Sequence, residues 1–270
     1  MSAPASDHRA RPTIGYALGG GAVRGAAHIG FLSVFEQAGI TPDFIAGTSA
    51  GAVVGAGYAA GLAVAEMSRL AGSTSWRDVT DVAWKQRMSL FDTTPLMRWI
   101  QGAIGDIDFS DLRIPLAAVA CNIIDGHRVV LRDGSVVFAA VASSTIPGLF
   151  NPLPLDDKLL VDGGLVENLP VSVARDMGAD IVVAVDVSPA LRQGLRPRNL
   201  PDIVSATATI AARNTQVAAR MEADFLVEPD VEQFQLWDFT QSAEIEEAGR
   251  VAAQRVVGDV LAVLEQARER

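Results

Sequence analysis

A serine between glycines stands where an apolar run meets a helix-forming stretch. Residues 47–51 read Gly-Thr-Ser-Ala-Gly, directly after the apolar residues 44–46 and directly before the small residues 52–60. A strand, a sharp turn and a helix in this order form a nucleophile elbow, which lifts the serine hydroxyl clear of the sheet. Gly47 and Gly51 support this interpretation, because a Cβ at either position would collide with the neighbouring strand or helix. The pattern predicts nucleophilic chemistry at Ser49, with an ordinary tight turn as the alternative.

Acyl transfer also needs a base within reach of the serine proton, and the histidines are poorly placed for that role. The three histidines are His8 in the polar N-terminal segment, His28 inside the first predicted helix and His127 just after a predicted hairpin turn. This placement does not match the order serine, acid, histidine of α/β-hydrolases. We expect His28 to pack or hydrogen-bond within its own helix, while His127 stays open as the third member of a triad.

A carboxylate is therefore the expected base, and Asp162 is the best placed. It ends the apolar run 159–161 and precedes Gly163 and Gly164, which allow the backbone to approach closely. Burial raises a carboxyl pKa towards the working range, so an aspartate in a dry site can act as a base, although a weaker one than imidazole. Such a pair suits esters and thioesters better than amides. The alternatives are an ordinary Asp-Gly turn at this position and Asp186 as the base.

Three consecutive glycines, Gly19, Gly20 and Gly21, lie between a predicted strand and a predicted helix. Several backbone N–H groups can point the same way at such a turn, which makes an anion pocket. We interpret the loop as an oxyanion hole, with Arg24 either bracing it or meeting a substrate phosphate. Tight strand-to-helix packing and a dinucleotide-binding loop are the alternatives. A dinucleotide site would place an acidic residue at the end of the second strand, where residues 47–49 stand instead.

Alternating strand and helix patterns predict an α/β sandwich. Strands are expected at 13–18, 43–48, 180–187 and 225–227 and around the Asp125-Gly126 hairpin turn within 115–132, and helices at 26–38, 52–60 and 203–221 and near the C-terminus. The first two strands should be parallel neighbours, and the continuously apolar run 180–187 fits a central parallel strand. In the final helix one apolar stripe should face the core, formed by Ile245, Ala248, Ala252, Val256, Val260 and Val263.

A stretch without a clean period, 75–110, predicts a cap over the site. Large apolar side chains gather in it among polar residues, and they are Trp76, Trp84, Met88, Leu90, Phe91, Leu96, Met97, Trp99, Ile100 and Ile104. We expect them to line an acyl path or to rest on a membrane surface. The alternative is ordinary packing of a surface subdomain.

Composition favours a single domain and excludes some partners. The chain has 270 residues, 49% hydrophobic and 20% charged, with a net charge of -10, so it offers no basic surface for nucleic acid. Its one cysteine, Cys121, excludes an intramolecular disulfide and lies in an apolar run, and no metal cluster is expected. Residues 1–12 are polar and predict a flexible tail without a secretory signal, and no 18-residue apolar span is present, so we expect a cytoplasmic protein.

Taken together, the motifs resemble the patatin-like phospholipase family. The resemblance rests on the glycine loop 19–25, the elbow 47–51 and the Asp-Gly-Gly turn 162–164, with further similarity at 142–150 and 168–170. It implies one domain over 13–270 with a three-layer α/β/α fold and a mostly parallel central sheet. It covers about 14–187, and the C-terminal part is matched less firmly.

The resemblance also implies an activity, namely hydrolysis of acyl esters in phospholipids, lysophospholipids or neutral lipids. Carried over by position, Ser49 would be the nucleophile and Asp162 the general base, and the loop 19–21 would supply oxyanion donors. No cofactor or metal is implied. A regulatory or binding protein that keeps the fold without turnover is the alternative. Head group, acyl length, position of cleavage and oligomeric state are not predicted.

Overall fold

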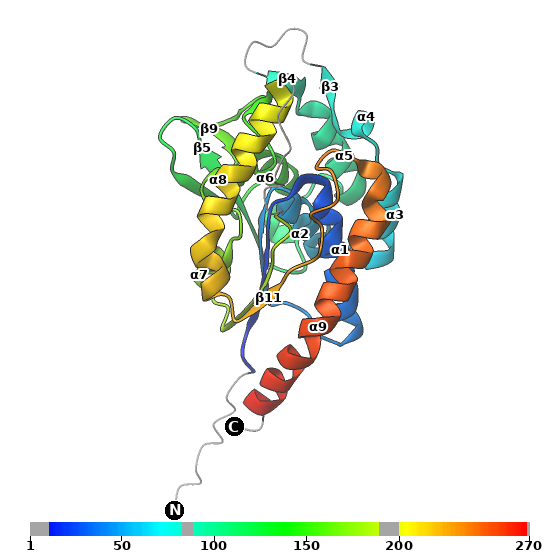
Figure 1. Cartoon of the computed structure of the whole chain (residues 1–270). Coiled ribbons are helices and arrows are strands. Elements are labelled where there is room, and N and C mark those ends of the chain that lie inside the picture. The colour runs from blue at the N-terminus through cyan, green and yellow to red at the C-terminus, as the bar shows by residue number, and fades with distance from the viewer. Residues whose placement is uncertain (1–10, 83–88, 189–199, 269–270) are drawn as a thin grey trace, which may run out of the picture.

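A mostly parallel sheet forms the centre of the molecule, and helices cover both of its faces (Figure 1). The structure is a computed structural model that describes residues 11–82, 89–188 and 200–268. Within these residues the main sheet has the strand order β11-β10-β1-β2-β5-β9-β8, and β6 pairs with β5 in addition. The strands are β1 (Ile14–Leu18), β2 (Phe44–Thr48), β5 (Leu116–Asn122), β6 (Arg128–Leu131), β8 (Leu153–Leu155), β9 (Lys158–Asp162), β10 (Ile181–Val185) and β11 (Phe225–Val227).

Strand direction divides this sheet into two parts. The strands β11, β10, β1, β2 and β5 run parallel to one another, whereas β6 and β9 pair antiparallel with β5, and β8 pairs antiparallel with β9. The predicted parallel pairing of the first two strands and the hairpin around Asp125-Gly126 are both confirmed. The run 180–187 forms β10, which is buried along its whole length but lies next to the edge strand β11 and not at the centre of the sheet.

Alternate residues of the strands face two separate apolar cores, as expected for a three-layer α/β/α fold. On one face Tyr16 and Leu18 pack with side chains of α1, α2 and α9. On the other face Ala17 and Ala184 pack with side chains of α7 and α8. The helices are α1 (Ala26–Gln37), α2 (Ala50–Ala60), α3 (Val64–Ser73), α4 (Trp76–Val79), α5 (Thr94–Ile104), α6 (Val136–Ser143), α7 (Val171–Asp176), α8 (Leu200–Glu222) and α9 (Ser242–Arg268).

Short elements complete the connections. A second, smaller sheet joins β3 (Asp81–Val82), β4 (Ser89–Asp92) and β7 (Gly148–Phe150). Short 3-10 helices lie at η1 (Ala22–Gly25), η2 (Phe109–Asp111), η3 (Gly163–Leu165) and η4 (Phe239–Gln241). In the described parts of the chain, every helix is either too short or too polar to cross a membrane.

The predicted cap region contains more regular structure than its sequence suggests. Residues 75–110 hold α4, β3, β4 and the helix α5, which begins with Pro95 in its first turn and ends at Gly105. The Asp92 carboxylate accepts the N–H of Thr94 at 2.8 Å and so stabilises the start of α5. Trp84 and Met88, which were assigned to the cap, lie outside the described residues, as does the tail up to residue 10.

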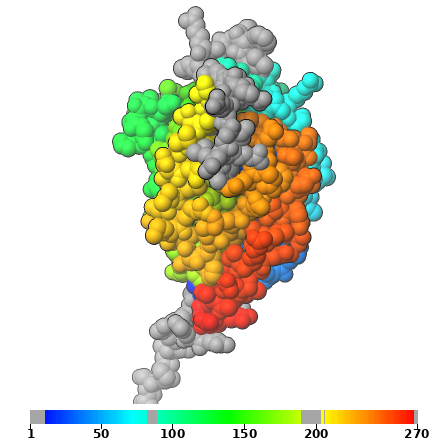
Figure 2. Space-filling view, viewed as in Figure 1, coloured from blue at the N-terminus to red at the C-terminus, as the bar shows by residue number. Residues whose placement is uncertain are grey.

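The final helix α9 lies along α1, in orange to red beside blue in Figure 1 and at the surface in Figure 2. Ile245, Ala252 and Val260 are buried as the stripe predicts, but Val263 is 39% exposed, so the stripe ends one turn early. The two helices meet at glycines. A Cβ on Gly249 would lie 1.9 Å from the Ala27 carbonyl oxygen, and a Cβ on Gly30 would lie 2.0 Å from that of Glu246. Close approach of these backbones therefore requires glycine on both helices.

Substitution of Gly249 tests this helix contact. Gly249→Ala should destabilise the protein by about 3 kcal/mol, because the new methyl group forces the helices apart. Gly258→Ala is the matched control in the same helix, since nothing lies within 4 Å of its added Cβ. That variant should be as stable as the parent or about 1 kcal/mol more stable. Urea unfolding measures both, and equal effects of the two changes would contradict the packing.

Candidate active site

Ser49 lies at the turn between β2 and α2 in a strained backbone conformation. Its φ of 53° and ψ of -124° are unusual for a residue with a Cβ, and such conformations cost about 1–3 kcal/mol. The turn is held by Ser143, whose hydroxyl oxygen accepts the N–H of Ser49 at 2.8 Å. The same hydroxyl donates to the Val119 carbonyl at 2.5 Å. The turn at Ser49 is therefore fixed from behind by β5 and the end of α6.

The flanking glycines are required by close contacts. A Cβ on Gly51 would lie 2.0 Å from the Leu18 carbonyl oxygen, and a Cβ on Gly47 would lie 2.6 Å from Cα of Ala52. Real Cβ contacts do not reach these distances. Both glycines therefore allow α2 to start against β1 and β2, which brings the hydroxyl of Ser49 to the carboxyl end of the parallel strands.

Asp162 meets Ser49 across 113 positions of sequence. The Ser49 hydroxyl donates to Asp162 Oδ2 at 2.7 Å, and Asp162 Oδ1 accepts the N–H of Gly164 at 2.8 Å. The register explains the meeting, because Asp162 lies opposite Ala120 of β5, and Ala118 of β5 lies opposite Gly47 of β2. Gly163 fits this place since a Cβ there would lie 2.2 Å from the Val119 carbonyl oxygen.

The environment makes Asp162 a better base than an exposed aspartate. Burial raises the pKa of Asp162 from 3.8 to about 6, against the opposing effect of the hydrogen bonds from Ser49 and Gly164. Near neutral pH the carboxylate is therefore ionised, but its proton affinity is closer to that of imidazole. The Ser49 hydroxyl already donates to this carboxylate, so the geometry allows the carboxylate to accept the Ser49 proton.

The glycine loop lies beside Ser49, but its amides are used differently from the prediction. The N–H of Gly19 donates to the Val185 carbonyl at 3.0 Å, and the N–H of Gly20 donates to the Asn168 carbonyl at 3.1 Å. These two amides already have acceptors within the protein, so neither N–H is free to meet an oxyanion in this structure. The third predicted donor, Gly21, lies with Ser49 and Asp162 on the wall of one cavity.

Gly21, Ala22 and Ala50 each share a cavity wall with Ser49, and their backbone N–H groups are candidate oxyanion donors. In the described part of the chain no backbone carbonyl accepts the N–H of Gly21 or Ala22. Ala50 is the first residue of α2, where the N–H has no partner within the helix. Ala22 and Ala50 were missed from the sequence, because a backbone donor leaves no signal in the residue type. A developing negative charge near Ser49 Oγ can be met by these N–H groups.

Arg24 braces the loop and does not supply an oxyanion donor. Its guanidinium is buried and donates to the carbonyls of Phe234 and Glu232, with a distance of 3.0 Å from Nε to Phe234 O. Its backbone N–H donates to Gly21 O at 3.2 Å. Both donor groups are therefore directed to carbonyls of the protein. Of the two interpretations of Arg24, the structure favours the brace over contact with a phosphate.

Two further residues hold the loop, and sequence reasoning gave neither a role in the site. His28 is buried, and its Nε2 lies 2.8 Å from the Gly19 carbonyl. Burial lowers the pKa of His28 to about 4, so the ring is neutral and Nε2 carries the proton that it donates. The Asn168 amide donates to Gly20 O at 3.3 Å and to Gln216 Oε1 at 3.1 Å. The loop is thereby fixed to α1 and α8.

The competing candidates lie elsewhere. Asp186 accepts the N–H of Ser188 at 2.9 Å and lies 3.5 Å from Arg220, whereas the Ser49 hydroxyl donates to Asp162. The His127 side chain is 83% exposed on the β5–β6 hairpin and lies 3.4 Å from Asp125. No group of three or more possible metal ligands occurs among the described residues.

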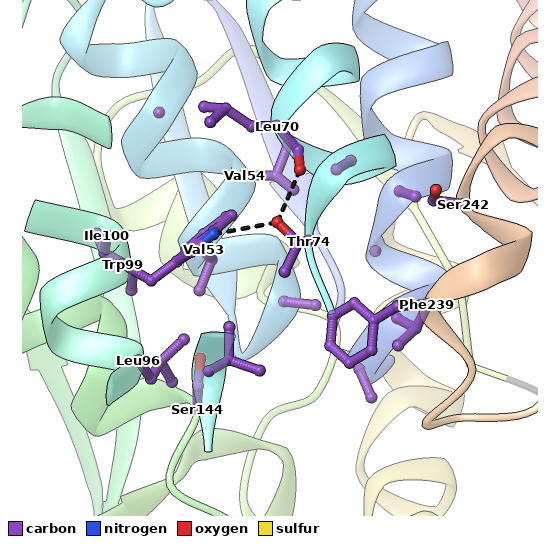
Figure 3. A pocket seen from close by; sticks show the side chains of 18 of the residues that line it. Val53, Val54, Leu70, Thr74, Leu96, Trp99, Ile100, Ser144, Phe239 and Ser242 are labelled. Carbon is purple, nitrogen blue, oxygen red and sulfur yellow. Dashed lines mark hydrogen bonds between the residues drawn. The ribbon is translucent and has the colours of Figure 1, made fainter. Parts of the chain in front are cut away.

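Two cavities meet at Ser49. The larger, of about 210 Å³, is apolar and lies between α2, α3 and α5, with Trp99, Ile100 and Phe239 among its walls (Figure 3). Two of its polar wall groups are paired within the protein, since Thr74 donates to Leu70 O at 2.7 Å and accepts the Trp99 indole N–H at 3.1 Å. The smaller cavity, of about 70 Å³, is lined by Asp162, Gly21 and residues of α8. An ester bound at Ser49 can direct one part into each.

Fold and site together define an α/β/α protein with a buried serine–aspartate pair at the carboxyl end of its parallel strands. The model of the patatin-like phospholipase family matches residues 16–175, which include the elbow and the Asp-Gly-Gly turn. This match covers more than half of the chain. The chain belongs to the patatin-like phospholipase family.

Known proteins of several organisms are similar to the chain. Human patatin-like phospholipase domain-containing protein 6 is 36% identical over 183 residues, which are 65% of this chain and 13% of that protein. Lysophospholipase NTE1 of Saccharomyces cerevisiae is 35% identical over 183 residues, which are 66% of this chain and 11% of that protein. An uncharacterized NTE family protein of Mycobacterium bovis is 30% identical over 272 residues, covering 90% of this chain and 46% of that protein. The chain thus spans less than half the length of these relatives.

The fold has a solved counterpart. The crystal structure of VipD from Legionella pneumophila superposes with a TM-score of 0.61 at 12% sequence identity, covering 93% of this chain and 67% of that chain. At this low identity the similarity concerns the fold alone. It agrees with the predicted three-layer arrangement, which is confirmed.

Stability measurements on Asp162→Asn test the buried carboxylate. The native pKa of Asp162 lies above its ordinary value, so its contribution to stability is greatest when the carboxyl is protonated and is lost as pH rises through about 6. The stability of Asp162→Asn relative to the parent should therefore grow by about 1–2 kcal/mol between pH 5 and pH 8. Urea unfolding at both pH values measures this. Ser49→Ala keeps the carboxylate, so its stability relative to the parent should not increase between the two pH values. An equal stability difference between Asp162→Asn and the parent at both pH values would contradict the raised pKa.

Proposed function

We propose that the protein is a lipid acyl hydrolase in which Ser49 is the nucleophile and Asp162 is the general base. The observation that carries the proposal is the 2.7 Å hydrogen bond from the Ser49 hydroxyl to Asp162 Oδ2, made at a strained elbow beside an apolar cavity. The membership of the chain in the patatin-like phospholipase family supports the same reaction class.

The steps of the reaction follow from the positions of these groups. Asp162 accepts the proton as Ser49 Oγ attacks the ester carbonyl, and the N–H groups of Gly21, Ala22 and Ala50 stabilise the oxyanion. Asp162 then gives the proton to the leaving alcohol, and the acyl group stays on Ser49. Water then attacks this acyl-enzyme as Asp162 takes its proton, and Asp162 returns that proton to Ser49 Oγ as the acid departs, which restores both residues. A carboxylate base of this strength suits esters and thioesters, whose leaving groups depart more readily than amines.

The substrate class is that of lipid acyl esters. The larger cavity offers mostly apolar walls, and its Thr74 and Trp99 polar groups are paired with each other or with the backbone, which fits an acyl chain and not a charged ligand. One relative carries the name lysophospholipase, in agreement with a lipid ester. Contact of the cap region with a membrane surface and a cytoplasmic location stay predictions.

Turnover of p-nitrophenyl acyl esters tests the proposal. Ser49→Ala should lower kcat/KM by about a thousandfold or more, and Asp162→Asn should do so to a similar extent, because each removes a group that acts as a unit with the other. His127→Ala is the control and should keep the parent activity, since that side chain is exposed on a hairpin. Full turnover by Ser49→Ala would contradict the mechanism. Lack of turnover by the parent on short and long esters, lysolipids and thioesters would favour a binding protein.

The pH dependence of the reaction gives a second test. Because Asp162 must be ionised to accept the Ser49 proton, kcat/KM should rise about tenfold per pH unit on the acid side and level off above about 6. Initial rates of ester hydrolysis at low substrate concentration between pH 4.5 and pH 8 give kcat/KM, whose pH profile reports the pKa of the free enzyme. A profile with an apparent pKa near 4 would indicate that the base is an exposed carboxylate and not Asp162.

A further inference from the structure

Helix α2 carries three glycines in its interior, and packing explains two of them. A Cβ on Gly51 would lie 2.0 Å from the Leu18 carbonyl oxygen. A Cβ on Gly55 would lie 3.1 Å from Ile45 Cγ2 and 3.3 Å from Leu116 Cδ1, which is tighter than most Cβ contacts. Close neighbours therefore account for glycine at both positions.

Gly57 differs from the other two. Its added Cβ would meet only Leu62 Cδ1 at 3.4 Å and Met67 Cε at 3.5 Å, which are ordinary van der Waals contacts. Gly57 does not have the positive φ that favours glycine. Alanine at this position would also be a better helix former. Neither packing nor backbone conformation thus explains why the residue is glycine.

The place of Gly57 in the molecule suggests an explanation. The larger cavity is lined along α2 by Ala50, Val53, Val54 and Gly57, whose spacing of three, four and seven residues puts them on one face of the helix. This face begins directly after Ser49. Figure 3 shows Val53 and Val54 on the α2 side of the cavity, with Leu96, Trp99 and Ile100 of α5 across from Val53. The cavity therefore follows α2 away from the nucleophile, and Gly57 lies farthest along it.

The length of this path can be compared with an acyl chain. Gly57 is eight positions after Ser49 in the chain, which corresponds to about 12 Å along an α-helix. An extended hydrocarbon chain advances about 1.25 Å per carbon, given carbon–carbon bonds of about 1.5 Å. A chain of about ten carbons attached at Ser49 Oγ would therefore reach Gly57, where Leu62 and Met67 also line the cavity.

We propose that Gly57 sets the depth of the acyl site, so that straight chains of about ten carbons bind fully and a side chain at this position shortens the site. The inference rests on the proposed function, because that function identifies the occupant of the cavity as the acyl chain of an ester. Because Gly57 has no side chain, the cavity extends past this position, and Leu62 and Met67 form its end wall.

The test compares chain-length profiles of Gly57→Ala and Gly57→Leu with the parent, using p-nitrophenyl butyrate, octanoate, decanoate and dodecanoate. Each methylene group lost from an apolar site weakens binding about fourfold. Gly57→Leu should therefore lower the decanoate-to-butyrate ratio of kcat/KM at least about tenfold, and Gly57→Ala should lower it less.

Met67→Ala should raise the dodecanoate-to-decanoate ratio. Gly102→Ala is the matched control, a helical glycine of α5 with nothing within 4 Å of its added Cβ, and should keep the parent profile. The proposal would be overturned if Gly57→Leu, shown by circular dichroism to be folded, kept the decanoate-to-butyrate ratio of the parent.

A binding measurement separates this proposal from the proposed function. Ser49→Ala and the double variant Ser49→Ala/Gly57→Leu are titrated with a dansyl-labelled undecanoic acid, whose fluorescence reports burial without turnover. Weaker binding to the double variant by about tenfold would support the chain site even if the parent hydrolysed no ester. Equal binding to both proteins would overturn it, even if Ser49 proved to be the nucleophile.

Discussion

The hydrogen bond between Ser49 and Asp162 depends on the register of three strands. The serine follows β2, the aspartate ends β9, and β5 pairs with both, so a shift of either pairing by one residue would separate the two side chains. The site is for this reason a property of the sheet and not of either loop. Glycines at 47, 51 and 163 serve the same end, because each lets backbone approach where a Cβ would collide.

The burial that fixes this pair also sets its chemistry. The low exposure of Asp162 raises its pKa to about 6, which makes the carboxylate more basic but makes its ionised form less favourable in the folded protein. The strained φ of Ser49 adds to the same loss of stability. The large apolar cores on both faces of the sheet offset these terms. The site is thus an example of local destabilisation that the surrounding fold tolerates for a reactive geometry.

The parts of the molecule that could be predicted are those with local signals. Ser49 is marked by its flanking glycines and by the change from strand to helix pattern, and Asp162 by its place at the end of an apolar strand. Their spatial meeting is expected from the poor placement of the histidines and from the resemblance, but the antiparallel return of β9 beside β5 leaves no trace in the spacing of the two residues. The helix α5 was missed since its apolar positions merge with those of the strands before it.

The N–H groups proposed as oxyanion donors show most clearly what the sequence alone does not reveal. Three consecutive glycines suggest three available amides, but the carbonyls of Val185 and Asn168, more than 140 residues away, accept two of them. Which N–H groups stay available depends on the tertiary contacts of the loop. Gly57 is a similar case, because the sequence shows a glycine in a helix but not the cavity beside it.

Covalent labelling of the nucleophile tests the central claim most directly. The protein is treated with a long-chain alkyl fluorophosphonate, which reacts with activated serines, and the modified peptide is identified by mass spectrometry. The account predicts one adduct on Ser49, formed at a rate that rises through about pH 6 and falls at least a hundredfold in Asp162→Asn. Labelling at another residue, or labelling of Ser49 at an equal rate in Asp162→Asn, would contradict it.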